Sequence, residues 1–376
     1  MTSRLKFRLH HLLCLGCIPL LACQQAPEQP AATTPPRPDA LETAVIVRTE
    51  APSEQAALSV GLVEFDPGIP ENSASHIKLG VFPRIRRAEA RYLPYALRET
   101  LVNSNHWGPV RVLPETDSGS ELLVHGRIVQ SDGVTLRVHI TASDATGRNW
   151  LDREYGESTE ESDYASGAGR ARPFQDLYNQ VANDLYRVLQ SLDDRALAEI
   201  RQVAELRYAV DLAPDAFRGY VGTDDDGRYV VQRLPARGDP MLNRIERVKQ
   251  QEYIFIDTVD EQYSLLYSDM TPTYDLWRQF NREQALYREQ REERLAGREA
   301  EPKGSYSRMK QTYNAFKWSK IQEQELRELA LGFHNEVAPT SMEIQGRVVR
   351  LSGSLESRYG EWRRILREIY ALETGG

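Results

Sequence analysis

Three runs of alternating apolar and polar residues constrain the fold of this chain more than any other feature. They read "ELLVHGRIVQ", "VTLRVHITAS" and "RNWLDREY", and two short turns separate them, Ser131-Asp132-Gly133 and Asp144-Ala145-Thr146-Gly147. Alternation buries one face of a strand, and Asp with Gly in a short connection favours a tight turn. The pattern therefore predicts a three-stranded antiparallel meander.

Further strands and helices are expected on both sides of this meander. The run "LSVGLVEFDPG" (58–68) is apolar until Asp-Pro-Gly ends it, and "VRVLPE" is a second short strand. Apolar residues at helical spacing predict helices over 84–105 and 174–192. Pro94 conflicts with the first helix, because proline inside a helix removes a hydrogen bond, so we expect a kink or a later start. Residues 56–192 are thus expected to form a small α/β domain.

The chain changes character after residue 192. Residues 193–334 have a helical pattern and are rich in Tyr, Trp and Phe, with a hairpin-like or loop insertion over 222–240. The stretch "REQREERLAGREAEPKG" lies between two aromatic stretches and predicts two long antiparallel helices joined by a turn. Asp224-Asp225-Asp226-Gly227 in the insertion lacks the ligand spacing of an EF-hand loop, so we expect no metal there.

The aromatic residues of these helices have two interpretations. Such stripes most often form core, and the alternative is a groove for a peptide, a glycan or an acyl chain. Both interpretations stay open on the sequence alone. The candidate groove residues are Tyr274, Trp277, Phe280, Tyr313 and Trp318.

The last segment, 335–376, has the pattern strand, tight turn, strand, helix. Its "VVRLSGSLES" precedes an amphipathic stretch with Trp362, Ile365 and Ile369 on one face. This arrangement resembles part of a BON domain, a module of periplasmic proteins that is associated with phospholipid or envelope binding. The whole chain is expected to have an α+β fold: a small α/β domain with the meander, an aromatic-rich helical domain with long antiparallel helices, and a C-terminal β-hairpin/helix unit.

The N-terminus has the pattern of a secretory signal. Three basic residues precede an apolar stretch from about Leu9 to Ala22, and all three cysteines of the chain lie in or beside it. The stretch is shorter than the roughly 20 apolar residues that a membrane-spanning helix needs. Residues 1–22 are therefore expected to be a signal peptide.

The end of this stretch, Leu20-Leu21-Ala22-Cys23, resembles the lipobox of bacterial lipoproteins. The resemblance implies cleavage between Ala22 and Cys23, a diacylglycerol on the Cys23 thiol, and a fatty acid such as palmitate on the new amine. Gln24, where aspartate would signal retention, implies sorting to the outer membrane. Residues 23–55 are then the lipid anchor and a tether, since "QQAPEQPAATTPPRPDA" has five prolines in 17 residues.

The expected element order of residues 56–192 resembles a small domain of several envelope lipoproteins. These are the curli secretion-channel lipoprotein, lipoprotein activators of penicillin-binding proteins and auxiliary lipoproteins of lipid-transport ABC systems, and the TolB N-terminal domain is similar. The stretches "RYLPYALRETL", "WGPVRVLP" and "LLVHGRI" add local likeness. Because those domains act by binding partners, the resemblance implies an envelope protein partner.

Residues that point to catalysis or to a cofactor are sparse. The five histidines after the signal segment lack metal-ligand spacing, no G-x-S-x-G motif occurs, and cleavage leaves only the acylated Cys23 as a cysteine. His125 and His139 on neighbouring strands and Glu64 at the end of the first strand are the first candidates for a site assembled from distant residues. We expect no enzyme activity and no cofactor.

Charge narrows the choice of partners. Cleavage before Cys23 removes three basic residues and no acidic one, so the formal net charge changes from −8 to −11, which argues against nucleic acid. The sequence thus predicts an outer-membrane-anchored lipoprotein on the periplasmic face that acts as an interaction or assembly factor for an envelope complex. The alternative is a lipid- or glycan-binding lipoprotein that uses the aromatic helical domain and the BON-like tail.

Overall fold

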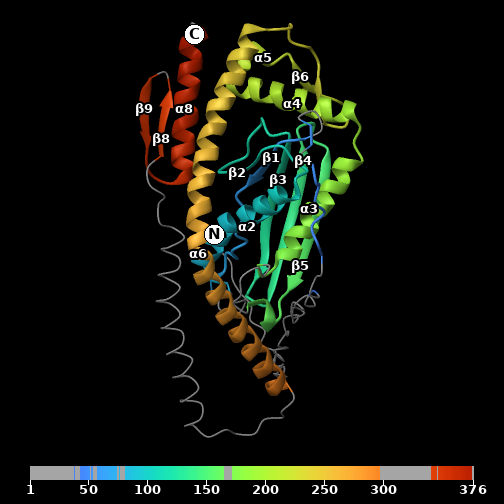
Figure 1. Ribbon diagram of the computed structural model, residues 1–376, viewed down its shortest axis with the longest axis vertical. Coiled ribbons are helices and arrows are strands. Elements are labelled where there is room, and N and C mark those ends of the chain that lie inside the picture. The colour runs from blue at the N-terminus through green and yellow to red at the C-terminus, as the bar shows by residue number, and fades with distance from the viewer. Residues whose placement is uncertain are drawn as a thin grey trace, which may run out of the picture. The chain divides into compact units, whose positions relative to one another are not determined.

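A five-stranded mixed sheet lies at the centre of the fold, with the strand order β2-β1-β3-β4-β5 (Figure 1). Strand β1 is parallel to β2 and to β3, whereas β3, β4 and β5 pair antiparallel. The antiparallel pairs confirm the predicted meander. The five strands are β1 (Val60–Val63), β2 (Val110–Leu113), β3 (Leu122–Ser131), β4 (Thr135–Asp144) and β5 (Asn149–Ser158).

The computed structural model describes residues 38, 43–50, 52–53, 57–73, 76, 81–164, 172–296, 340–344 and 346–374. Helices and a C-terminal hairpin accompany the sheet, as the predicted α+β class requires. The helices are α2 (Pro83–Ser104), the short η1 (Glu161–Tyr164), α3 (Gln175–Gln190), α4 (Asp194–Leu212), α5 (Pro214–Phe217), α6 (Pro240–Ala296) and α8 (Leu355–Thr374). Two hairpins complete the fold, β6 (Val221–Thr223) with β7 (Tyr229–Val231) and β8 (Thr340–Ile344) with β9 (Arg347–Leu351).

The two turns of the meander follow from their Asp and Gly residues. Gly133 and Gly147 have φ of 83° and 84°, in the left-handed region that favours glycine. Asp132 and Asp144 each accept a hydrogen bond from the backbone N–H two residues later, at 3.0 and 2.9 Å. An aspartate that bonds its own turn in this way fixes the turn locally. The two turns of the meander are therefore fixed by short-range interactions that can be predicted from the sequence.

Helix α2 contains Pro94 yet begins at Pro83, so the later start that the proline suggested is not seen. A proline lacks the N–H that would bond the carbonyl four residues earlier, which here belongs to Ala90. The backbone N–H of Phe65 donates to that carbonyl at 2.9 Å. The hydrogen bond that the helix loses is replaced from the segment after β1, which ties the helix to the sheet.

Helices α3 and α4 are separate, with α3 ending at Gln190 and α4 beginning at Asp194. The Asp193 carboxylate accepts a hydrogen bond from the backbone N–H of Ala196 at 2.8 Å and caps α4. An aspartate at this position stabilises a new helix start. The chain therefore turns between α3 and α4 instead of extending one rod.

Helix α6 spans 57 residues and covers the edge strand β2. The Asp260 carboxylate accepts the backbone N–H of Val112 at 3.1 Å, and Arg111 donates twice to the Asp257 carboxylate at 2.7 and 2.9 Å. These bonds occupy an edge that would otherwise offer free backbone groups. The second of the two predicted long helices lies outside the described residues.

The C-terminal hairpin and α8 pack against the first half of α6. Trp362 is fully buried, lies 6.2 Å from the Phe255 ring, and donates its indole N–H to the Gln251 carbonyl. One hydrophobic cluster extends from Leu58 to Tyr370, and all described residues belong to one compact unit. None of the helices in the described ranges has the length and apolarity that crossing a bilayer requires.

Candidate functional site

His125 and His139, the candidates for an assembled catalytic site, do not pair across the meander. His125 lies opposite Thr141, and His139 lies opposite Arg127. The His139 ring is 3.1 Å from the Asp152 carboxylate. Burial lowers the pKa of His125, so its ring is neutral at pH 7. The two histidines are diagonal neighbours with different partners.

Glu64 has its own partners at the end of β1. Arg91 of α2 donates to the Glu64 carboxylate at 3.2 Å and to the Glu356 carboxylate at 2.6 Å, and thereby links the sheet to the first turn of α8. Burial raises the pKa of Glu64, and the neighbouring Glu356 raises it further. The cavity beside this ion pair has a volume of only about 20 Å³, close to that of a single water. Such a space excludes an organic substrate.

Among the candidate groove residues, Tyr274 and Trp277 belong to the packed interface between α6 and α2. Tyr274 is 1% exposed, and its hydroxyl donates to the Glu89 carboxylate at 2.5 Å. Its ring stacks on Trp277, which in turn meets the Phe82 ring edge-on. The two residues thus follow the core interpretation. The side chain of Phe280, and all of Tyr313 and Trp318, lie outside the described residues.

A buried polar network joins α4, α6 and α8. The Glu252 carboxylate of α6 accepts hydrogen bonds from the Tyr208 hydroxyl at 2.7 Å and the Tyr359 hydroxyl at 2.5 Å. Arg363 lies 3.4 Å from the same carboxylate. Burial raises the pKa of Glu252, and Asp117 contributes, whereas Arg363 and the two tyrosines oppose the rise. These groups satisfy one another, so the network is structural.

Metal ligands do not gather in the part of the chain that the structure describes: no group of three or more His, Cys, Asp or Glu is arranged to hold an ion. The insertion with the Asp224 run forms the small hairpin of β6 and β7, as predicted. Asp224 accepts hydrogen bonds from the backbone N–H groups of Asp226 and Arg228. This aspartate therefore holds its own turn.

A larger groove lies between the first turns of α6, the strand β8 and the end of α8. Its volume is about 490 Å³. Apolar side chains and charged side chains of both signs share its walls. The lining includes Arg244, Arg247, Glu343, Ile344, Ile369 and Glu373. The groove has the size of a ligand site, but its mixed charges point to no single ligand class.

The most distinctive surface is a row of exposed apolar side chains on α6. The row consists of Ile254, Leu265, Leu276 and Tyr287, which are 48%, 68%, 67% and 57% exposed. Each is 11 residues after the previous one, and 11 residues make just over three helical turns, so all four lie on one face of the helix. The helix contains Pro272 and changes direction near its middle (Figure 1). This set of four side chains, here called the apolar row, extends about 50 Å along the helix path.

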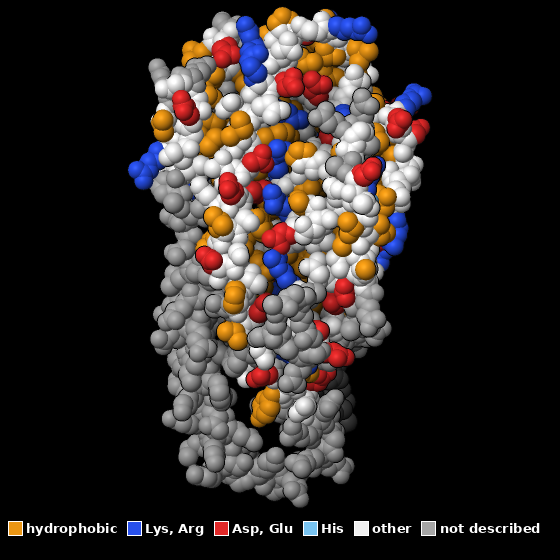
Figure 2. Space-filling view, viewed as in Figure 1, with side chains coloured by type: hydrophobic (Ala, Val, Ile, Leu, Met, Phe, Trp, Pro, Cys, Tyr) orange, Lys and Arg blue, Asp and Glu red, His pale blue; other side chains and the backbone are white. Residues whose placement is uncertain are grey.

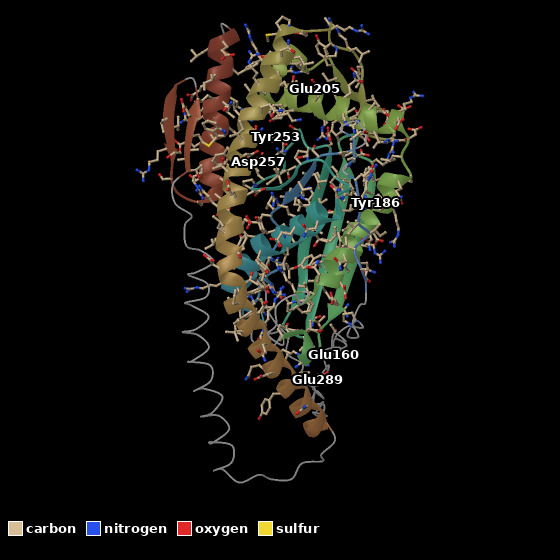
Figure 3. The ribbon with its side chains drawn as sticks, viewed as in Figure 1. Glu160, Tyr186, Glu205, Tyr253, Asp257 and Glu289 are labelled. Carbon is tan, nitrogen blue, oxygen red and sulfur yellow. The ribbon has the colours of Figure 1, made fainter. Side chains whose placement is uncertain are left out.

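Acidic side chains accompany the apolar row. Glu261, Asp269 and Glu283 are exposed and lie close to it on the helix surface. From Ile254 to Trp277 the helix has no lysine or arginine. Figure 2 shows hydrophobic patches at intervals down α6 with acidic side chains beside them. A basic residue of β2, Arg111, lies over the Tyr253 ring and bonds Asp257. Figure 3 labels these two α6 residues.

Comparisons of the chain with family models, with curated proteins and with solved structures give no match. The site is thus defined by its own geometry. The apolar row was not predicted from the sequence, because the aromatic stripes of α6 dominate its pattern. The 11-residue spacing of the row is nevertheless present in the sequence and is the signal that identifies it.

Proposed function

We propose that this chain is a lipoprotein of the outer membrane that faces the periplasm and acts as an interaction or assembly factor for an envelope complex. The observation that carries the interaction role is the apolar row of α6. Exposed leucine surface is unfavourable in water, and its removal by a partner contributes about 25 cal/mol per Å². A row at fixed spacing on one face of a helix suits a partner helix, which presents side chains at the same intervals.

The charges beside the row define the chemistry of that partner. A second copy of this chain would bring more acidic residues to the acidic border of the row, so self-association is electrostatically unfavourable. The partner is an amphipathic helix with apolar residues for the row and Lys or Arg for Glu261, Asp269 and Glu283. Such charges steer association and fix the register. The proposal gives the chain no catalytic role and no cofactor.

The membrane anchor is tested at Cys23. Inhibition of lipoprotein signal peptidase with globomycin should raise the mass of the chain by that of residues 1–22. A Cys23→Ala variant should lose the acyl groups, keep residues 1–22 and leave the outer-membrane fraction, because lipidation at Cys23 precedes cleavage and the lipid chains supply about 0.8 kcal/mol per buried CH₂. Mass spectrometry and membrane fractionation measure both. Unchanged processing and fractionation would contradict the anchor.

The interaction role is tested on the apolar row. A photo-crosslinker at Glu261 should capture one basic envelope protein, whose binding to the purified chain is then measured. The double variant Leu265→Ser/Leu276→Ser should weaken this binding at least tenfold, since each buried leucine contributes about 1.5–3 kcal/mol. Its melting temperature should stay near that of the unchanged chain, because both side chains are exposed.

Two controls separate the row from general surface effects. Leu372→Ser alters an 81% exposed leucine of α8 away from the row and should leave the affinity unchanged. The variant His125→Ala/His139→Ala/Glu64→Gln should keep envelope function in a complementation assay, because no chemistry is assigned to these groups. Equal losses of affinity in both leucine variants would refute the row as the binding surface. Loss of envelope function in the triple variant without a change in melting temperature would indicate catalysis.

The groove between α6, β8 and α8 favours the alternative, a lipid- or glycan-binding lipoprotein. Its volume of about 490 Å³ is in the range of ligand pockets. Native mass spectrometry of the chain purified from membranes distinguishes the two functions. A bound lipid or glycan that Ile369→Arg removes would support the alternative and displace the interaction role.

A further inference from the structure

An extended segment before β1, residues 43–48, is bound along α3 by side-chain amides. The Asn183 amide contacts it in both directions: its carbonyl oxygen accepts the backbone N–H of Ile46 at 2.8 Å, and its NH₂ donates to the Ala44 carbonyl at 3.0 Å. One helical turn earlier, the Asn179 NH₂ donates to the Thr43 carbonyl at 2.7 Å. The side-chain amides of two asparagines four residues apart therefore bond the backbone of the segment, as the edge strand of a sheet would.

The other end of the segment is bound by the end of α2. The Arg48 backbone N–H donates to the Ser104 carbonyl at 3.0 Å, and the Asn105 NH₂ donates to the Arg48 carbonyl at 3.2 Å. His106 Nε2 lies 3.1 Å from the Ile46 carbonyl. The His106 ring stacks at 3.6 Å on Tyr186 of α3, whose place Figure 3 shows.

Three of these side chains are buried when the segment is in place. Asn179, Asn183 and His106 are then 7%, 4% and 3% exposed. Asn179 is also held from its own helix, since it accepts a bond from Gln175 at 3.0 Å. The segment thus contributes to the burial of the two asparagine amides and supplies their hydrogen-bond partners, as buried polar groups require.

The bound segment is recognised through its main chain. Each of the hydrogen bonds described above that reaches the segment involves a backbone N–H or carbonyl of residues 43–48. Ile46 and Val47 are 39% and 58% exposed, and Val45 is the apolar side chain of the segment that packs against the core. Main-chain bonds give affinity without side-chain specificity, as in peptides that add a strand to a sheet.

We propose that Asn105, His106, Asn179 and Asn183 form a binding site for an extended peptide main chain, and that residues 43–48 are its resident ligand. The site holds the N-terminal part of the chain against the folded unit. Pro38 also lies close to Gly156 of β5. In the lipoprotein proposed above, on which this one consequence rests, the site limits the distance between the folded unit and the membrane. A tether of residues 24–37 spans about 45 Å when extended, whereas release of Pro38 and of residues 43–48 lengthens it to 24–56 and about 100 Å.

Hydrogen exchange of backbone amides tests the site on the mature chain. We use the chain with Cys23→Ala produced without residues 1–22, so that the result does not depend on lipidation or on cleavage. In this chain the amides of Ile46 and Arg48 should exchange at least 100-fold more slowly than in a free peptide. Asn183→Leu should raise the exchange rate of the Ile46 amide at least tenfold, while the Leu185 amide in the middle of α3 keeps its protection and reports that the helix is folded.

A sequence swap on the ligand is the matched control. The variant Ile46→Ser/Val47→Ser keeps every main-chain bond and should keep the slow exchange at residues 46 and 48. Trypsin cleavage after Arg48 gives a second readout, slow in the chain with Cys23→Ala and in the swap variant and at least tenfold faster in Asn183→Leu. Fast exchange at Ile46 in the chain with intact Asn183 would overturn the proposal. Equal loss of protection in the swap variant would overturn recognition through the main chain.

Discussion

Glu252→Ala is expected to lower the free energy of unfolding by about 3–5 kcal/mol, among the larger effects of a single substitution in this chain. Glu252 is 2% exposed and accepts hydrogen bonds from the Tyr208 and Tyr359 hydroxyls. Its removal leaves two buried hydroxyls without an acceptor, at about 1–3 kcal/mol each, and opens a cavity. Arg363 keeps Asp211 at 2.5 Å, so its charge is not stranded. Equilibrium unfolding in urea measures the change.

The matched control is Glu246→Ala. Glu246 lies on the same helix, six residues earlier, and is exposed. Its substitution should change the free energy of unfolding by less than about 0.5 kcal/mol. Glu252 connects elements from distant parts of the chain, so its loss should also loosen α8, which amide exchange of that helix reports. A change below 1 kcal/mol in Glu252→Ala would show that the network does not hold these helices together.

Much of the fold could be predicted because the relevant interactions are local. Asp132 and Asp144 bond their own turns, and alternation along β3 and β4 places apolar residues on one face. The hairpin and helix after residue 340 follow from the same short-range rules. Because these interactions join residues that are close in the sequence, the strands and turns that depend on them can be predicted from it.

Contacts between distant segments could not be predicted in the same way. The pairing of His139 with Arg127 depends on the register of β3 and β4, which shifts at a bulge between Ile128 and Gln130. A shift of the strand register by one residue changes which side chains face each other. The spacing of residues in the sequence does not indicate such a bulge. Pro94 is a second case, since the N–H that satisfies the Ala90 carbonyl comes from Phe65 in the segment after β1.

The apolar row and the site for residues 43–48 also differ in how far the sequence predicts them. The apolar row lies on one helix. Its 11-residue spacing can be recognised in the sequence once the structure shows which aromatic and aliphatic residues of the helix are exposed. The site for residues 43–48 has no such spacing, because Asn183 bonds the backbone of Ile46, 137 residues earlier in the chain. The proline-rich composition predicted a tether over residues 23–55. Composition gives no information about main-chain hydrogen bonds. Only the fold brings these asparagines to the segment.

Glu157→Gln is expected to stabilise the chain above neutral pH and to leave it unchanged in acid. Glu157 is 7% exposed, and its carboxylate accepts the backbone N–H of Leu177 at 2.7 Å in the first turn of α3. Burial raises its pKa from 4.5 to about 7; Asp176 and Asp163 add to the rise, whereas the Leu177 bond and Arg278 oppose it. The folded chain therefore holds a proton that the unfolded chain has lost, and its stability falls as the pH rises from about 4.5 to 7. Glutamine keeps an acceptor for Leu177 without the charge, so the variant should gain about 1–3 kcal/mol at pH 8.

Urea unfolding of both chains at pH 4.5, 6, 7 and 8 measures this difference, and other titrating groups such as Asp260 cancel because both chains contain them. The control is Glu160→Gln, three residues later and exposed (Figure 3), which should show no such pH dependence. A stability difference between Glu157→Gln and the unchanged chain that stays constant over this range would show that Glu157 titrates normally. A loss of stability at pH 8 would show more: the ionised carboxylate would then be favourable at the start of α3, and its interaction with the helix N-terminus and Arg278 would outweigh the cost of burial.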